Sequence, residues 1–215
     1  MKPRGLAKAI GVITMLSAVS IGSRAEEIIP PAVVARDQWR AAPHNPALMK
    51  TQTISGIIIH HTDTAQAPQR PLEEKLRNLQ SFSQRPGTLS GTGKAKPAWG
   101  DLPYHYYIDV RGRIGEGRRL EFAGDTNTGY KTQGYVQIVL EGKFEKEKPT
   151  VQQLSALDEL VAWLVRSQKI KPSAITSHND HAASDCPGKN LKPHIELLRD
   201  RFLREAYDAK VAPRR

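Results

Sequence analysis

Two histidines and the only cysteine of this chain have side chains that could together hold one metal ion. His60 ends a short apolar run at residues 57–59, and His178 and Cys186 lie about 120 residues later in one loop. A strand that ends in a histidine, together with a loop that offers an imidazole and a thiolate, can supply three ligands to a zinc ion. Catalytic zinc sites use three protein ligands and keep a fourth position open, so the set predicts a zinc hydrolase with one Zn²⁺ per chain.

Cys186 has other possible roles. One cysteine cannot form an internal disulfide in an oxidising compartment, so it is a buried bystander, a reactive thiol or a metal ligand. The nearby His178 favours the metal ligand, because thiolate and imidazole together select zinc over magnesium or calcium. A single His–Cys pair is nevertheless common by chance, and the motif by itself is not specific.

The first 25 residues have the pattern of a secretory signal peptide. A basic start up to Lys8 precedes the apolar stretch at residues 9–22, which is too short to span a bilayer comfortably. The sequence at residues 23–25, Ser-Arg-Ala, fits a small-x-small cleavage site. We therefore expect an exported protein without stable membrane insertion after cleavage; an uncleaved N-terminal anchor is the alternative.

The charge of the chain is basic but dispersed. The formal charge is +10, and residues 1–25 contain four basic and no acidic residues, so cleavage leaves +6. Such a balance favours anionic partners, such as cell-wall polymers or membrane surfaces. Because the charges occur singly rather than in blocks, the sequence does not indicate nucleic-acid binding.

Hydrophobic periodicity predicts an α/β protein with a mixed central β-sheet flanked by about three helices. The predicted main domain spans residues 53–207. It follows an extended segment at 26–52, in which Pro30 and Pro31 disfavour helix and Trp39 packs on the domain, and it precedes a flexible tail at 208–215. The predicted strands are 53–60, 104–110, 113–116, 135–141 and 174–176; the predicted helices are 71–83, 150–171 and 193–207, and 85–100 is a long surface loop.

Four motifs in order resemble the zinc-dependent N-acetylmuramoyl-L-alanine amidases of the type 2 amidase and peptidoglycan recognition protein group. They are the Arg…Trp signature at 35–39, Ile-Ile-Ile-His-His-Thr at 57–62, the tyrosine strand and hairpin at 102–118, and the His…Cys-Pro-Gly loop at 177–188. The resemblance extends over residues 35–202. It implies a peptidoglycan recognition protein-like single domain.

The resemblance also implies roles for individual residues. His60, His178 and Cys186 match the zinc ligands, and Tyr104 matches the catalytic tyrosine. Ser184 stands where the group more often has lysine or threonine assisting the tetrahedral intermediate. A serine hydroxyl can donate a hydrogen bond but brings no positive charge, which leaves that assisting role in doubt.

Substrate contacts are expected from four further residues. His61 falls outside the set of zinc ligands and is expected to line the cleft or to contact one of the metal-binding side chains. His105 matches a histidine of phage-type members. Arg118 could meet a peptide carboxylate. Trp99, in the loop 85–100, could wall the cleft, although a solvated loop is the alternative.

The leading hypothesis is an exported amidase that cleaves the bond between N-acetylmuramic acid and L-alanine in peptidoglycan or muropeptides. We expect a monomer in the periplasm, with the outside of the cell as the alternative, because a compact domain without wall-binding repeats suits a thin wall. A non-catalytic peptidoglycan-binding module is the second reading. A zinc peptidase that cuts within the stem peptide is the third.

Overall fold

The computed structural model describes residues 29–89 and 93–212, so the predicted signal peptide lies outside the described residues. The described chain forms one six-stranded sheet, a small two-stranded sheet and three α-helices. In chain order the elements are β1 (Val33–Val34), η1 (Pro46–Leu48), β2 (Gly56–His61), α1 (Leu72–Ser83), β3 (Gly87–Thr88), β4 (Ala95–Lys96), β5 (Tyr106–Ile108), β6 (Ile114–Glu116), β7 (Tyr135–Leu140), α2 (Val151–Ser167), η2 (Pro172–Ala174), β8 (Ile175–Ser177), η3 (His178–Asp180) and α3 (Lys192–Val211).

The main sheet is mixed, and its strand order is β1-β6-β5-β7-β2-β8. Strands β7, β2 and β8 run parallel, whereas β5 and β6 form the antiparallel hairpin that the sequence predicted. Gly112 has a φ of +77° in the hairpin turn, a conformation that glycine adopts without steric penalty. The predicted mixed sheet with three helices is confirmed.

Strand β2 forms where the sequence predicted it because residues 57–59 are three β-branched isoleucines, which suit a buried strand. All six residues of β2 are buried, as expected for a central strand of a parallel sheet. Ile57 and Ile59 pack in the cluster formed with α2 and α3. The period of two in a strand therefore turns Ile58 and His60 toward the other face.

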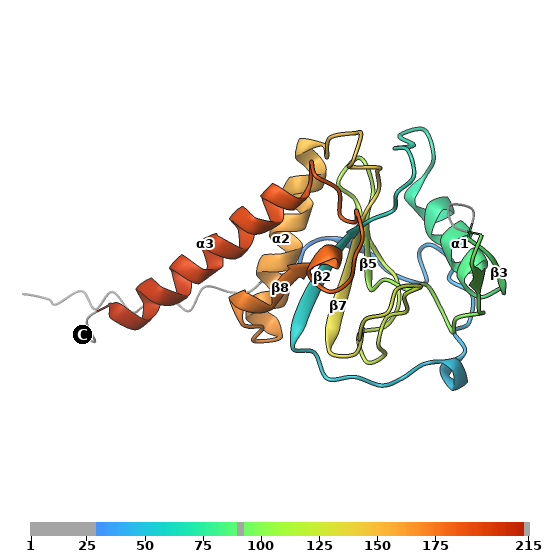
Figure 1. Cartoon of the computed structure of the whole chain (residues 1–215), viewed down its shortest axis with the longest axis horizontal. Helices are drawn as coiled ribbons and strands as arrows, with labels where there is room; N and C mark the ends of the chain where they lie inside the picture. Colours follow the sequence, from blue (N-terminus) through green and yellow to red (C-terminus); the bar gives the residue numbers. More distant parts are fainter. Residues whose placement is uncertain (1–28, 90–92, 213–215) are drawn as a thin grey trace, which may run out of the picture.

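Helices cover both faces of the sheet. In Figure 1, α2 and α3 lie on one side of β2 and β7, and α1 lies on the other. On the α1 side, Leu72 and Leu76 pack with Trp39, Tyr107 and Val139 in a second hydrophobic cluster. The site residues described below lie on this α1 side.

Helix α2 begins with a capping box. Thr150 Oγ1 accepts a hydrogen bond from the Gln153 backbone N–H, and the Gln153 side chain accepts one from the Thr150 N–H. Val151, in the first turn of the helix, is 79% exposed. Leu160 is fully buried in the middle of the helix.

Helix α3 is longer than expected and ends at Val211, four residues beyond the predicted end at 207. Its last buried residue is Phe202, and beyond it the helix extends away from the domain (Figure 1). Residues 208–211 of the expected tail are thus helical, and residues 213–215 lie outside the described part.

Trp39 joins the N-terminal segment to the domain. The side chain is fully buried, and its indole Nε1–H donates to the Glu116 carbonyl oxygen at 2.8 Å. It belongs to the second hydrophobic cluster. Residues 29–52 thus pack on the domain through this tryptophan.

The described part of the loop at 85–100, residues 85–89 and 93–100, is more structured than expected. It contains the short antiparallel pair β3–β4, and Lys96, at the end of β4, is buried. The Lys96 ammonium donates to the carbonyl oxygens of Ser83, Arg85 and Pro97, and it lies over the ring of Trp99. These contacts fix the loop against the end of α1.

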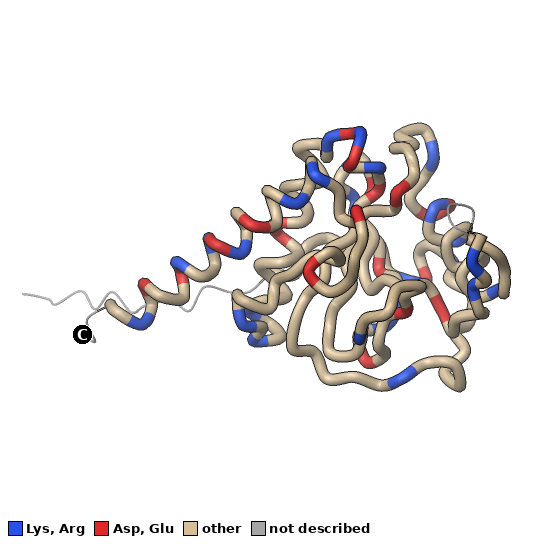
Figure 2. The backbone as a smooth tube through the Cα atoms, viewed as in Figure 1, with Lys and Arg blue, Asp and Glu red and all other residues tan. Residues whose placement is uncertain are grey.

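Charged residues are dispersed over the fold. Figure 2 shows Lys and Arg interspersed with Asp and Glu along the backbone, α3 included. Within the described residues, no helix combines the length and the apolar character needed to cross a membrane.

Two leucine substitutions test how the sheet is covered. Leu160→Ala in α2 removes a fully buried side chain and should lower the free energy of unfolding by about 2–5 kcal/mol. Leu197→Ala in α3 is the matched control, because Leu197 is 65% exposed, and its effect should stay within about 0.5 kcal/mol. Urea denaturation measures both; equal losses would contradict this packing.

Candidate metal centre

The strand register brings His60 beside His178. Ile59 of β2 pairs with Ser177 of β8 in a parallel ladder, so the next residue of each strand path, His60 within β2 and His178 just after β8, lies at the same edge of the sheet. The two imidazole rings lie with their centroids 4.9 Å apart. Ligand sites in open α/β sheets form at this carboxyl-terminal edge of the strands.

A compact loop returns the chain from His178 to Cys186. The Asn179 backbone N–H donates to the Cys186 carbonyl oxygen at 3.0 Å, which closes the loop. Lys192 of α3 holds the first turn of this loop through an ion pair with Asp180. Gly188 has a φ of +92° and packs directly on the backbone of Phe144, where a side chain would not fit.

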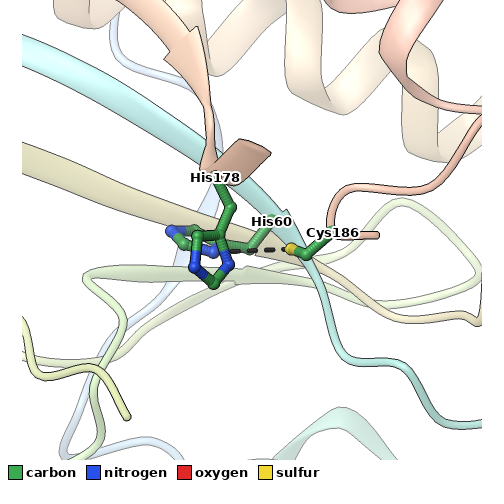
Figure 3. Close-up of side chains that lie close together, drawn as sticks. All are labelled: His60, His178 and Cys186. Atoms are coloured by element: carbon green, nitrogen blue, oxygen red, sulfur yellow. Dashed lines mark hydrogen bonds between the residues drawn. The ribbon is translucent and has the colours of Figure 1, made fainter. Parts of the chain in front are cut away.

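The three predicted ligands converge. The ligand atoms of His60, His178 and Cys186 all lie within 4.8 Å of one another, and His60 Nδ1 is 3.6 Å from Cys186 Sγ (Figure 3). Tetrahedral zinc with bonds of about 2.0–2.3 Å separates its ligand atoms by about 3.3–3.8 Å, and the His60–Cys186 distance lies in this range. The set could therefore hold one metal ion, and its nitrogen and sulfur donors suit zinc.

Burial shapes the protonation of the three ligands. Desolvation lowers the pKa of His60 to about 3 and the pKa of His178 to about 4, so both imidazoles are neutral at pH 7 and keep a lone pair. Burial also raises the pKa of the Cys186 thiol to about 12. The His61 backbone N–H donates to Cys186 Sγ at 3.3 Å, which favours the thiolate form once a cation is present.

A pocket of about 610 Å³ opens beside the two histidines. Its lining includes His60, His178 and Tyr104, together with residues from α1 and the loop that follows β2. The Tyr104 ring lies 5.3 Å from the His60 ring, centroid to centroid. Burial raises the pKa of Tyr104 above its usual value, so the phenol keeps its proton and can donate a hydrogen bond.

His61 and His105 lie outside the pocket lining. His61 Nδ1 accepts from the Phe144 backbone N–H at 3.2 Å, and the ring is buried behind the ligand set. His105 Nδ1 accepts from the Gln137 backbone N–H at 2.8 Å, and its Nε2 contacts the Phe122 carbonyl oxygen at 2.9 Å. Both side chains thus bind the backbone of this chain.

Arg118 is also unavailable to a ligand in this structure. Its side chain is buried, and its guanidinium donates to the carbonyl oxygens of Leu102, Ala123 and Asp101 and pairs with Asp125. This basic side chain holds the loop beside the pocket together. The expectation that it meets a substrate carboxylate does not agree with these contacts.

Trp99 lies at the pocket, whereas Ser184 lies in the loop that carries Cys186. Trp99 is half-buried and lines the pocket at the end near α1. Ser184 lies in the ligand loop, where its Oγ accepts a hydrogen bond from the Cys186 backbone N–H at 3.1 Å. Ser184 thus helps to shape the turn that presents the thiol.

Three residues around the ligands were missed by sequence reasoning. Thr128 Oγ1 lies 2.8 Å from His178 Nε2, the Tyr130 ring lies 5.1 Å from the His178 ring, and Gln137 Oε1 lies 2.6 Å from His60 Nε2. Thr128 and Tyr130 come from an irregular loop rich in glycine and threonine, where no periodicity indicates a direction. Gln137 is a polar residue in the otherwise apolar strand β7. That contrast is the one feature of the sequence that could have indicated its place beside the candidate ligands.

The metal centre predicts a specific loss of zinc. Cys186→Ser should weaken zinc binding by at least about 100-fold. Removing a residue that only hydrogen-bonds to a metal ligand already weakens metal binding by about 10–100-fold, and Cys186 is a candidate ligand itself. His194→Ala is the control, since His194 lies on α3 and pairs with Asp158. Competition with a chromophoric chelator measures both affinities, and unchanged binding in Cys186→Ser would refute the ligand assignment.

Comparison with known proteins identifies similar sequences. A family model described as N-acetylmuramoyl-L-alanine amidase matches residues 50–189. Peptidoglycan-recognition protein SD of Drosophila simulans is 31% identical over 171 residues, which cover 76% of this chain and 84% of the fly protein. Human N-acetylmuramoyl-L-alanine amidase is 27% identical over 173 residues, which cover 79% of this chain but 28% of the human protein.

Solved structures are similar to the fold as well. A mutant of Drosophila PGRP-LB, solved in complex with tracheal cytotoxin, is 26% identical and superposes with a TM-score of 0.61. The match covers 76% of this chain and 92% of that one. The peptidoglycan recognition protein-like fold that the motifs implied is thereby confirmed.

Proposed function

The chain belongs to the N-acetylmuramoyl-L-alanine amidase family, and on that basis we propose that it is an exported zinc amidase. Its proposed reaction is hydrolysis of the amide bond between N-acetylmuramic acid and L-alanine in peptidoglycan or its fragments. One observation carries the proposal: two neutral imidazoles and one thiol converge, and both imidazoles line a pocket that Tyr104 also lines.

Amide hydrolysis at neutral pH requires an activated water and stabilisation of the developing oxyanion. A bound zinc ion is a Lewis acid that polarises the amide carbonyl and lowers the pKa of water toward about 7. His60, His178 and Cys186 are the residues that would hold it. Because a catalytic zinc needs an open position, the pocket beside the two histidines is where the substrate carbonyl would enter.

Tyr104 is proposed to act on the oxyanion. Its phenol is protonated at neutral pH and lies beside His60, so the O–H can donate a hydrogen bond to charge that develops on the carbonyl oxygen. Ser184 lacks the charge of a lysine, and its Oγ already accepts from the Cys186 N–H. We therefore assign the main stabilising role to Tyr104 and a supporting one to Ser184.

The rest of the pocket suits a peptide. It continues from the metal centre toward α1, where Leu79, Phe82 and Trp99 provide apolar walls and Arg70 adds a charge. A stem peptide attached to the scissile amide could lie there. The complex of a PGRP-LB mutant with tracheal cytotoxin supports a peptidoglycan fragment as the ligand class.

Export and oligomeric state are part of the proposal. The signal-peptide pattern at residues 1–25 supports secretion into the periplasm, with the outside of the cell as the alternative. We propose that the protein acts as a monomer.

A second candidate is a peptidoglycan-binding module without turnover. A relative named as a recognition protein is 31% identical, and Ser184 departs from the usual lysine or threonine. Cys186 argues for the enzyme, because a thiolate completes the ligand set.

Muropeptide digestion distinguishes these functions. The purified mature protein with stoichiometric zinc should release free stem peptide, and a chelator should abolish the release while added zinc restores it. Mass spectrometry of the products separates this amidase from a peptidase, which would leave a shortened stem on the sugar. Binding of muropeptide without any product would instead establish the recognition module.

Tyr104→Phe should retain zinc and lower kcat by about 10–1,000-fold, because one oxyanion donor is lost. Tyr106→Phe is the matched control: Tyr106 is two residues away but packs in the cluster on the opposite face of the sheet, and its activity should be unchanged. Zinc content and steady-state kinetics are measured for both variants. Full activity of Tyr104→Phe would remove this residue from the mechanism.

A further inference from the structure

Gln137 is a buried polar residue in the middle of β7, and its side chain contacts a metal ligand. It is 1% exposed, and its Oε1 lies 2.6 Å from His60 Nε2. The other ring nitrogen of His60, Nδ1, faces Cys186 Sγ at 3.6 Å. The two nitrogens of one imidazole therefore point to two different partners, the amide and the metal centre.

The amide oxygen decides which nitrogen of His60 carries the proton. A carbonyl oxygen only accepts hydrogen bonds, so His60 Nε2 must be the N–H donor. A neutral imidazole has one N–H, so Nδ1 then keeps its lone pair toward the thiol and the metal. The opposite orientation of the amide would leave the proton on Nδ1 and block coordination there.

The surrounding residues hold Gln137 in this orientation. The Tyr130 hydroxyl also approaches Oε1, at 3.4 Å, and can donate to it. The His105 ring accepts from the Gln137 backbone N–H, and Gly124 leaves the space that the Gln137 side chain fills. Two donors at one oxygen favour the amide position that the His60 contact requires.

The amide nitrogen shows what this arrangement costs. Gln137 Nε2 is buried and has no hydrogen-bond partner within the described residues. A buried polar group without a partner is unfavourable, and an apolar residue would avoid this cost in an otherwise apolar strand. The contact of the Gln137 amide oxygen with His60 therefore explains a glutamine at this position, whereas a contribution to the stability of the fold does not.

His178 differs from His60 in this respect. Its Nε2 lies 2.8 Å from Thr128 Oγ1, and a hydroxyl can either donate or accept. Thr128 consequently does not select a tautomer of His178. Among the two ligand histidines, His60 is the one with an acceptor that dictates the proton position.

We propose that Gln137 is a positioning residue that holds His60 as the Nε2–H tautomer, with Nδ1 free to bind metal. The inference deepens the proposed zinc site and rests on it. Mutating a residue that hydrogen-bonds to a metal ligand typically lowers the metal affinity by about 10–100-fold.

Three variants test it. Gln137→Met keeps an unbranched side chain of similar length but removes the acceptor, and Gln137→Glu keeps an acceptor. Gln80→Met is the matched control, because Gln80 in α1 is similarly buried but donates to the Asp101 carboxylate and the Ala42 carbonyl oxygen, away from the candidate ligands. Amide proton spectra first confirm that each variant is folded.

Zinc affinity and the tautomer are then measured separately. Chelator competition should show a 10–100-fold loss for Gln137→Met, while Gln137→Glu and Gln80→Met stay within about threefold of the original chain. Two-dimensional ¹⁵N spectra of histidine-labelled, metal-free protein should show His60 as Nε2–H in the original chain and as a mixture, or as Nδ1–H, in Gln137→Met.

The outcomes separate this inference from the proposed function. If the original chain binds zinc and Gln137→Met binds it equally with the same His60 tautomer, the positioning role is wrong and the zinc site stands. If the original chain binds no zinc, the proposed function fails too. If Gln137→Met does not fold, Gln137→Glu and the original chain decide the matter. The positioning role is wrong if Gln137→Glu loses as much zinc affinity as Cys186→Ser, or if His60 is the Nδ1–H tautomer in the original chain. It is supported if His60 is the Nε2–H tautomer and Gln137→Glu still binds zinc tightly.

Discussion

The parallel pairing of β2 with β8 is the constraint on which the site depends. The register of Ile59 with Ser177 places His60, near the end of β2, beside His178, just after β8, although the two are far apart in the sequence. A shift of one residue would turn His60 to the other face of the sheet, into the core formed with α2 and α3. That shift is unfavourable because it would place the polar His60 in the apolar core that Ile57 and Ile59 occupy here.

The same alternation explains how one sheet provides both stability and chemistry. On β7, residues at even positions from Val136 to Leu140 pack in the core with α2, and Gln137 and Val139 turn toward the opposite face. Polar side chains on that face, such as His60 and Gln137, are buried beside the apolar cluster that α1 forms. Burial there keeps both imidazoles neutral, and a cation can replace the proton of the Cys186 thiol.

The sequence predicted the elements whose pattern is local and strong. Strand β2 and the hairpin follow from a β-branched run and a turn glycine, and both were found within a few residues of the expected ranges. The three ligands were predicted from residue type and order, and the fold brings them together.

Residues whose role depends on tertiary contacts could not be predicted. Thr128 and Tyr130 reach His178 from an irregular loop whose path no periodicity indicates. Arg118 and His105 were expected at the substrate because of their types and motif positions. In the structure both side chains instead hydrogen-bond to backbone groups of this chain. These contacts depend on the tertiary fold, so residue type and motif position could not predict them.

X-ray absorption spectroscopy at the zinc edge reports directly on which atoms bind the metal. For the purified mature protein with one equivalent of zinc, we expect one sulfur ligand at about 2.3 Å and two imidazole nitrogens at about 2.0–2.1 Å, with the remaining position filled by a light atom from solvent. A coordination shell without sulfur, or one closed by four protein ligands, would contradict this expectation.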